Sequence, residues 1–145
     1  MNKVQILLVE DSRADARLVV EIFREENIGV DIEVARDGEQ AMSYLNQCAD
    51  SNCPDLILLD LNMPKKDGRE VLAELKGLQR FRATPVVILT TSESEEDVLK
   101  SYNLQASCYV TKPFDLQRFT DIIKSLDQFW FSAVRFPPKQ CLQCQ

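Results

Sequence analysis

Five short apolar segments alternate with helix-length segments along the chain, and this alternation is the feature that most limits the possible folds. The apolar segments are rich in Val, Ile and Leu and lie at about 4–10, 30–35, 55–60, 85–90 and 107–111. The helix-length segments lie at about 12–27, 38–48, 68–79, 94–103 and 115–131. Strict alternation of this kind predicts an α/β fold, a doubly wound parallel sheet with right-handed crossovers and helices on both faces.

The length and composition indicate one globular domain, because 145 residues can bury a single core. We predict that residues 1–131 form this domain and that 132–145 form a partly disordered tail, since Pro137 and Pro138 end any helix. No apolar run approaches the roughly 20 residues of a membrane span. A strand also begins within the first residues, where a signal peptide would lie. These features favour a cytoplasmic protein without a membrane partner.

Charge and residue usage exclude several classes of function. Seventeen basic and 23 acidic residues give a net charge of -6, and such a surface repels the phosphates of nucleic acids. We therefore expect no nucleic-acid partner. The chain contains no histidine, which excludes catalytic sites with a histidine base and metal sites with histidine ligands.

The cysteines do not indicate a secreted, disulfide-bonded protein, since their number is odd and their spacing is irregular. They are Cys48, Cys53, Cys108, Cys141 and Cys144. The last two form a C-x-x-C pair, but no second pair accompanies them and they lie at the end of the chain. An inert tail is the simpler interpretation of this pair, with a metal or redox role as the alternative.

Two polar patterns mark the starts of predicted helices. Ser12 and Asp15 have the spacing of a capping box, with aspartate in place of the usual glutamate or glutamine. An acidic run at 93–97 crowds the start of another helix, where the helix dipole favours anions. We interpret this run as a solvated helix face.

Polar residues stand at the ends of four predicted strands. They are Glu10 and Asp11 after the first strand, Asp60 after the third, Thr90 after the fourth and Lys112 after the fifth. In an open parallel sheet the carboxyl ends of the strands share one edge, and ligands bind there. We therefore expect three carboxylates, a hydroxyl and an ammonium group to converge on one pocket.

The three carboxylates need a positive partner, because like charges in one site cannot all ionise without one. Mg²⁺ suits the site, since it takes one or two carboxylates together with water and phosphate oxygens. We expect Asp11 and Asp60 to hold the metal and Asn62 to add its backbone carbonyl oxygen. Glu10 would act through a metal-bound water.

Asp60 is the candidate nucleophile, because a carboxylate can form an aspartyl phosphate. Lys112 would pair with phosphoryl oxygens, and Thr90 would donate its hydroxyl to one of them. Pro113 pushes Lys112 out of helical geometry, which helps to direct the lysine toward the pocket. The strand ends therefore predict a site that accepts a phosphoryl group.

These residues lie in four motifs that closely resemble those of receiver domains of two-component response regulators. The motifs are Val-Glu-Asp-Ser at 9–12, Asp-Leu-Asn-Met-Pro at 60–64 followed by Asp67 and Gly68, Leu-Thr-Thr at 89–91, and Tyr-Val-Thr-Lys-Pro-Phe at 109–114. The match spans about residues 4–128. It implies a flavodoxin-like fold of five βα units with the strand order 2-1-3-4-5.

The resemblance implies a phosphoacceptor signalling protein rather than an enzyme. A sensor histidine kinase would transfer a phosphoryl group to Asp60 with Mg²⁺. Thr90 and Tyr109 would then act as the switch, since the threonine moves toward the phosphoryl group and the aromatic ring turns inward. We expect a stand-alone response regulator that signals by docking onto another protein or by passing the phosphoryl group on.

The last predicted helix stays apolar beyond the expected edge of the sheet. Phe129, Trp130 and Phe131 form a cluster, and Val134 and Phe136 follow. We expect an interface with a partner or a second copy of the chain at this cluster, with a tail folded back onto its own domain as the alternative. The cluster is similar to that of single-domain regulators that partner bacterial phytochromes, which points to a phytochrome-type kinase as one form of the partner.

Two other functions suit the fold but not the residues. A phosphatase with an aspartyl-phosphate intermediate typically carries a second aspartate two positions after the nucleophile, where this chain has Asn62. A flavodoxin-like flavin carrier needs a phosphate-binding loop after the first strand, where Glu10 and Asp11 would repel the phosphate. The residues therefore favour a phosphoacceptor over both alternatives.

Overall fold

Five parallel strands form one sheet in the order β2-β1-β3-β4-β5. The computed structural model describes residues 3–26 and 29–139. The strands are β1 (Val4–Val9), β2 (Val30–Ala35), β3 (Leu56–Leu59), β4 (Val86–Thr90) and β5 (Cys108–Thr111). The predicted flavodoxin-like strand order is therefore confirmed, with small differences at the strand ends.

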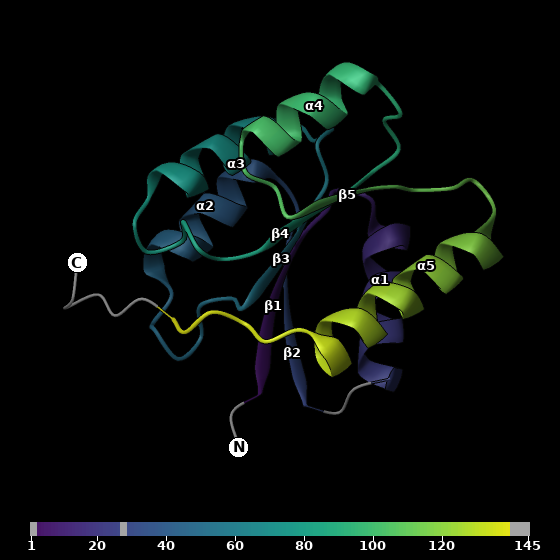
Figure 1. Cartoon of the computed structure of the whole chain (residues 1–145), viewed down its shortest axis with the longest axis horizontal. Helices are drawn as coiled ribbons and strands as arrows, with labels where there is room; N and C mark the ends of the chain where they lie inside the picture. The colour runs from purple at the N-terminus through teal and green to yellow at the C-terminus, as the bar shows by residue number, and fades with distance from the viewer. Residues whose placement is uncertain (1–2, 27–28, 140–145) are drawn as a thin grey trace.

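Helices cover both faces of the sheet (Figure 1). They are α1 (Arg13–Glu26), α2 (Gly38–Gln47), α3 (Gly68–Gly77), α4 (Glu95–Asn103) and α5 (Leu116–Gln128), and a π-helical turn, η1 (Phe129–Ala133), continues α5. The helices α1 and α5 lie on one face, and α2, α3 and α4 lie on the other. Within the described residues, no helix is both long and apolar enough to span a bilayer.

The strands divide the core into two apolar layers. Successive residues of a strand point to opposite faces, so Leu7 packs in the layer of α2 and α3 while Leu8 packs in the layer of α1 and α5. β3 and β4 are buried along their whole length, as is usual for the central strands of a parallel sheet. This packing fixes the positions of the residues that follow the strands.

The apolar segment after α5 packs onto its own domain. Trp130 is only 7% exposed, and its ring stacks on that of Phe136 with 5.9 Å between the centroids. Phe131 meets Phe23 of α1 edge to face at 5.7 Å. Of the three predicted interface residues, Phe129 is the one that stays largely exposed, at 55%. The structure thus corrects the prediction for Trp130, whose ring belongs to the core because the chain's own tail covers it.

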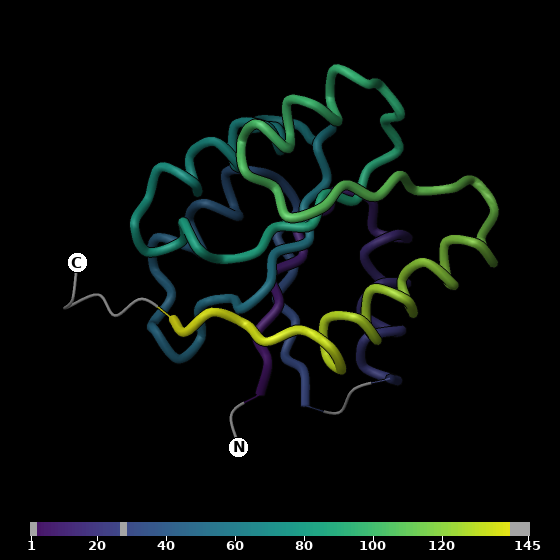
Figure 2. The backbone as a smooth tube through the Cα atoms, in the orientation of Figure 1, coloured from purple at the N-terminus to yellow at the C-terminus, as the bar shows by residue number. Residues whose placement is uncertain are grey.

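Residues 134–139 run from η1 across the amino-terminal edge of the sheet toward the loop that follows α2 (Figures 1 and 2). Lys139 donates a hydrogen bond to the carbonyl oxygen of Ser51 at 3.4 Å and lies 3.9 Å from the carboxylate of Asp55. The predicted boundary after residue 131 therefore falls inside η1. Residues 140–145, which include the C-x-x-C pair, lie outside the described residues.

Cys48 and Cys53 form a disulfide bond, with 5.3 Å between their Cα atoms. Cys48 follows the last residue of α2, and a tight turn then returns the chain toward β3. The N–H of Cys53 closes this turn by donating to the carbonyl oxygen of Ala49 at 2.9 Å. Cysteine count and spacing do not predict this pair, because its formation depends on the turn. Cys108 carries a free, half-buried thiol.

Replacing Trp130 with alanine should lower the free energy of unfolding by about 3 kcal/mol, because a large buried ring leaves the core. Phe129→Ala should cost less than about 1 kcal/mol, because the Phe129 ring is 55% exposed. Urea unfolding followed by circular dichroism measures both values. Equally small losses for the two variants would contradict the placement of Trp130 in the core.

Candidate functional site

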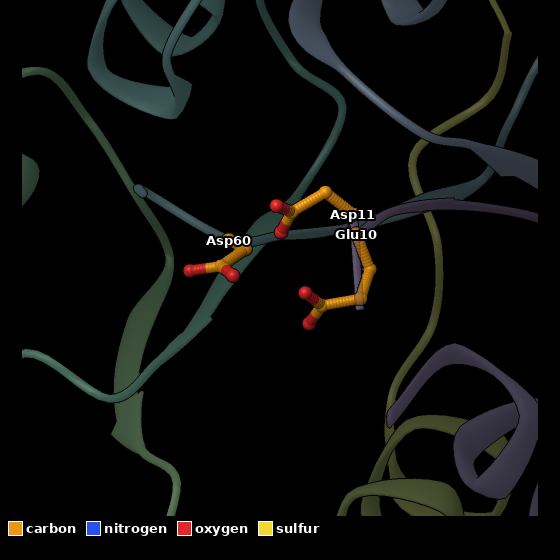
Figure 3. A group of neighbouring side chains, drawn as sticks. All are labelled: Glu10, Asp11 and Asp60. Carbon is orange, nitrogen blue, oxygen red and sulfur yellow. The ribbon is translucent and has the colours of Figure 1, made fainter. Parts of the chain in front are cut away.

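Three carboxylates meet at the carboxyl ends of β1 and β3. Glu10 and Asp11 follow β1 directly, and Asp60 follows β3, the neighbouring strand. Figure 3 shows the three side chains gathered at one place, and one oxygen from each lies within 4.8 Å of the others. Glu10 and Asp60 are buried, whereas Asp11 is exposed. The structure thus brings together the carboxylates that the sequence places at strand ends.

Lys112 supplies a positive charge at this edge. Its side chain is 4% exposed, and its Nζ donates to Glu10 and, at 3.0 Å, to Asp15. The carboxylate of Asp60 lies 3.5 Å from the same nitrogen. The backbone of Lys112 is fixed as well, since its N–H donates to the carbonyl oxygen of Thr90 at 2.7 Å. The structure thus places the ammonium group of Lys112 among carboxylates at the strand-end edge.

Burial dominates the electrostatics of Glu10. Burial and the charge of Asp60 raise the pKa of Glu10 from 4.5 to about 8, although Lys112 acts in the opposite direction. Burial lowers the pKa of Lys112, but its contacts with Glu10, Asp60 and Asp15 together outweigh burial, so the pKa of the lysine is raised overall. Glu10, Asp11 and Asp60 bring three carboxylates to one place, where Lys112 supplies one positive charge. This set of oxygen donors fits a hard divalent cation.

The loop after β3 is shaped around Asp60. The N–H of Asn62 donates to Oδ1 of Asp60 at 3.3 Å, which places the Asn62 backbone beside the carboxylate. The N–H of Gly68, at the start of α3, donates to the carbonyl oxygen of Leu61 at 2.9 Å. A side chain at position 68 would clash with the carbonyl oxygen of Asp60. Only glycine therefore allows α3 to begin so close to this strand end.

Thr90 and Tyr109 contact the same loop, which joins β4 to α4. Thr90 is fully buried, and its Oγ1 accepts a hydrogen bond from the N–H of Ser92 at 3.4 Å. The hydroxyl of Tyr109 donates to the carbonyl oxygen of Ser92 at 3.0 Å. Burial raises the pKa of this hydroxyl, so it keeps the proton that it donates. The two predicted switch residues are therefore linked through Ser92.

Asp15 is a contact of the site that the sequence patterns do not reveal. Its spacing from Ser12 indicates a helix cap, and its backbone N–H does donate to Oγ of Ser12 at 3.2 Å. Its carboxylate, however, also reaches Lys112. A strand-end pattern cannot show this contact, because Asp15 lies in the first turn of α1.

Asp97 is the second residue whose contacts differ from the sequence interpretation. It belongs to the acidic run interpreted as a solvated helix face, yet its carboxylate pairs with Arg69 of α3 at 2.7 Å and accepts a hydrogen bond from Oγ of Ser92 at 2.7 Å. The pairing with Arg69 and the Ser92 hydrogen bond lower the pKa of Asp97. Asp97 therefore connects α3, the loop after β4 and the start of α4.

Residues 6–124 match the response regulator receiver domain family. The response regulator Rcp1 of Synechocystis sp. is 47% identical over 135 residues, which cover 91% of this chain and 92% of Rcp1. The match to the family therefore includes most of β1, the other four strands and every residue of the site described above.

Solved structures give the same result. The crystal structure of the Mn²⁺-bound form of Rcp1 has a TM-score of 0.87 at 46% identity, covering 92% of this chain and 99% of that one. The crystal structure of the phosphorylated cyanobacterial phytochrome response regulator RcpA has a TM-score of 0.88 at 44% identity, covering 93% and 99%. The sheet order, the strand-end residues and these relatives agree. The chain therefore belongs to the response regulator receiver family.

Proposed function

We propose that this chain accepts a phosphoryl group on Asp60 from a sensor histidine kinase and signals by docking onto a protein or by phosphorelay. The observation that carries this proposal is the position of Asp60. It is a buried carboxylate beside two further carboxylates and one lysine, at the edge where ligands bind to parallel sheets. The phosphorylated structure of the relative RcpA supports the proposal.

Asp60 would act as the nucleophile. One of its carboxylate oxygens attacks the phosphorus of a phosphohistidine, the P–N bond breaks, and the imidazole leaves with its electron pair. The chain has no histidine, so the donor belongs to the kinase. Lys112, already 3.5 Å from the carboxylate, would pair with oxygens of the transferred group, and Thr90 would donate its hydroxyl to another.

Glu10, Asp11 and Asp60, with the carbonyl oxygen of Asn62, would hold Mg²⁺. The ion would offset the negative charge of the carboxylates and of the phosphoryl oxygens. Burial is the main cause of the raised pKa of Glu10, and the charge of Asp60 adds to it. A cation bound here would favour the ionised forms of both carboxylates. The Mn²⁺-bound structure of Rcp1 is a further argument for a divalent metal.

Thr90 and Tyr109 would carry the effect of phosphorylation toward the surface. If Thr90 turned its hydroxyl to the phosphoryl group, its Oγ1 would lose the hydrogen bond from the N–H of Ser92. The loop would then be free to move, together with the Ser92 carbonyl oxygen that holds the Tyr109 hydroxyl. The Tyr109 ring could turn inward once this contact is lost.

Exposed apolar side chains suit a protein partner. Most of the large ones lie on α4 or near the start of α5, and they are Leu99, Tyr102, Phe114 and Leu116. The similarity to RcpA, a cyanobacterial phytochrome response regulator, favours a kinase of the phytochrome type, which would place the protein in the cytoplasm. A homodimer through the end of α5 also stays a proposal, with Phe129 as its exposed ring.

Asp60→Asn should abolish phosphorylation, because an amide is a poor nucleophile. With Mg²⁺ and acetyl phosphate, the intact mass of the wild-type protein should rise by one phosphoryl group and that of the variant should not. Asp121→Asn changes an exposed aspartate on α5 and serves as the control that is phosphorylated normally. Undiminished phosphorylation of the Asp60 variant would exclude this residue as the acceptor.

Asp11→Ala should weaken Mg²⁺ binding about tenfold, or roughly 1.4 kcal/mol, because the metal loses a charged ligand. Asp11 is exposed, so the substitution should leave the fold intact. Isothermal titration compares the variant with the wild type and with Asp121→Asn. The ligand assignment fails if the Asp11 variant binds Mg²⁺ as tightly as the wild type does.

A further inference from the structure

Lys112 is held by three carboxylates, and one of them has no part in the proposed reaction. An ammonium group has three N–H donors, and that of Lys112 meets Glu10, Asp15 at 3.0 Å and Asp60 at 3.5 Å. Its donors are thus in use before a phosphoryl group arrives. A phosphoryl oxygen can gain a hydrogen bond from Lys112 only when one of these contacts lengthens or breaks.

The three carboxylates differ in how easily they can release the ammonium group. The side chain of Glu10 is 3% exposed and that of Asp60 is 9% exposed, whereas that of Asp15 is 33% exposed. A buried carboxylate that loses its partner also lacks water to replace it, which is costly. Asp15 can turn toward water, and Asp60 itself carries the phosphoryl group after the reaction. Asp15 is therefore the partner that can be exchanged at the lowest cost.

The short connection between β1 and α1 fixes Asp15 for this contact. The backbone N–H of Asp15 donates to Oγ of Ser12, and the N–H of Ser12 donates to Oε2 of Glu10, both at 3.2 Å. One segment thus positions both Glu10 and Asp15 against Lys112, while Asp60 comes from β3. The ammonium group lies closer to Asp15 than to Asp60, at 3.0 Å against 3.5 Å.

We propose that Asp15 is a positioning residue that holds Lys112 back from Asp60 in the unphosphorylated protein. The phosphoryl group must then compete with Asp15 for the ammonium group. Asp15 thereby sets how readily the protein adopts its phosphorylated conformation, because the contact between Asp15 and Lys112 stabilises the unphosphorylated conformation. This inference rests on the proposed role of Asp60 as the phosphoryl acceptor.

Asp15→Asn tests the proposal, because asparagine keeps the size of the side chain and the backbone contact with Ser12 but loses the charge that holds Lys112. Beryllofluoride, a mimic of the phosphoryl group, is titrated into the protein with Mg²⁺ while the amide signals of Thr90 and Tyr109 are followed. We expect the variant to bind beryllofluoride about threefold more tightly, because the substitution removes a partly exposed ion pair that competes for Lys112.

Glu21→Gln is the matched control, since it removes one negative charge from the same helix at an exposed position. It should bind beryllofluoride as the wild type does. Unchanged or weaker binding by Asp15→Asn, or equal tightening by the control, would overturn the role given to Asp15.

A second measurement separates an effect through Lys112 from a general effect of charge. The rate of phosphorylation by acetyl phosphate is measured by intact mass for Asp15→Asn, for Lys112→Ala and for the double variant. Asp15→Asn should raise the rate about threefold when Lys112 is present and leave it unchanged when the lysine is absent. Equal acceleration in both backgrounds overturns the inference. A wild-type protein that neither binds beryllofluoride nor becomes phosphorylated overturns the proposed function itself, and this inference with it.

Discussion

The buried ion pair of Lys112 and Glu10 is the interaction on which the site depends. Their side chains are 4% and 3% exposed, and a charge taken out of water to this extent costs several kcal/mol unless it is paired. Lys112 would be costly to bury without its carboxylate partners, and Glu10 is the most buried of them. Such a pair adds little to stability, so the apolar layers around β1, β3 and β4 must hold it in place. The result is an ammonium group fixed beside Asp60.

The convergence of Glu10, Asp60 and Lys112 could be predicted from the sequence because it follows from topology. Each residue comes directly after an apolar strand, and parallel strands end at the same edge of a sheet. An error of one or two residues in a strand boundary leaves the polar side chain at that edge. The strand order, and with it the neighbours of each residue, came from the resemblance of the motifs to a family rather than from periodicity.

Contacts made by helices and loops could not be predicted in this way. Asp15 fits a capping pattern, and Asp97 fits an acidic helix start. A helix start is enough to explain either pattern, so neither pattern indicates which other residues the carboxylate of Asp15 or Asp97 contacts. The apolar side chains around Trp130 had to be shielded from water, but the sequence left open whether the chain itself or another molecule shields them. That choice depends on the path of the tail, which the contacts of Phe136 and Lys139 determine.

The loop between β4 and α4 is restrained from two sides, and this limits how the site can communicate with the surface. Ser92 receives a hydrogen bond from Tyr109 and donates one to Asp97, which is paired with Arg69. Arg69 is the second residue of α3, a helix that begins against the carbonyl oxygen of Asp60. A movement of Ser92 must therefore break the contacts of Asp97 or carry α4 with it.

The Arg69 and Asp97 side chains are 23% and 18% exposed, so solvent partly screens their pairing and keeps its free energy modest. The loop is thus held in one conformation by contacts of modest strength, and the proposed phosphorylation of Asp60 would have to compete with them.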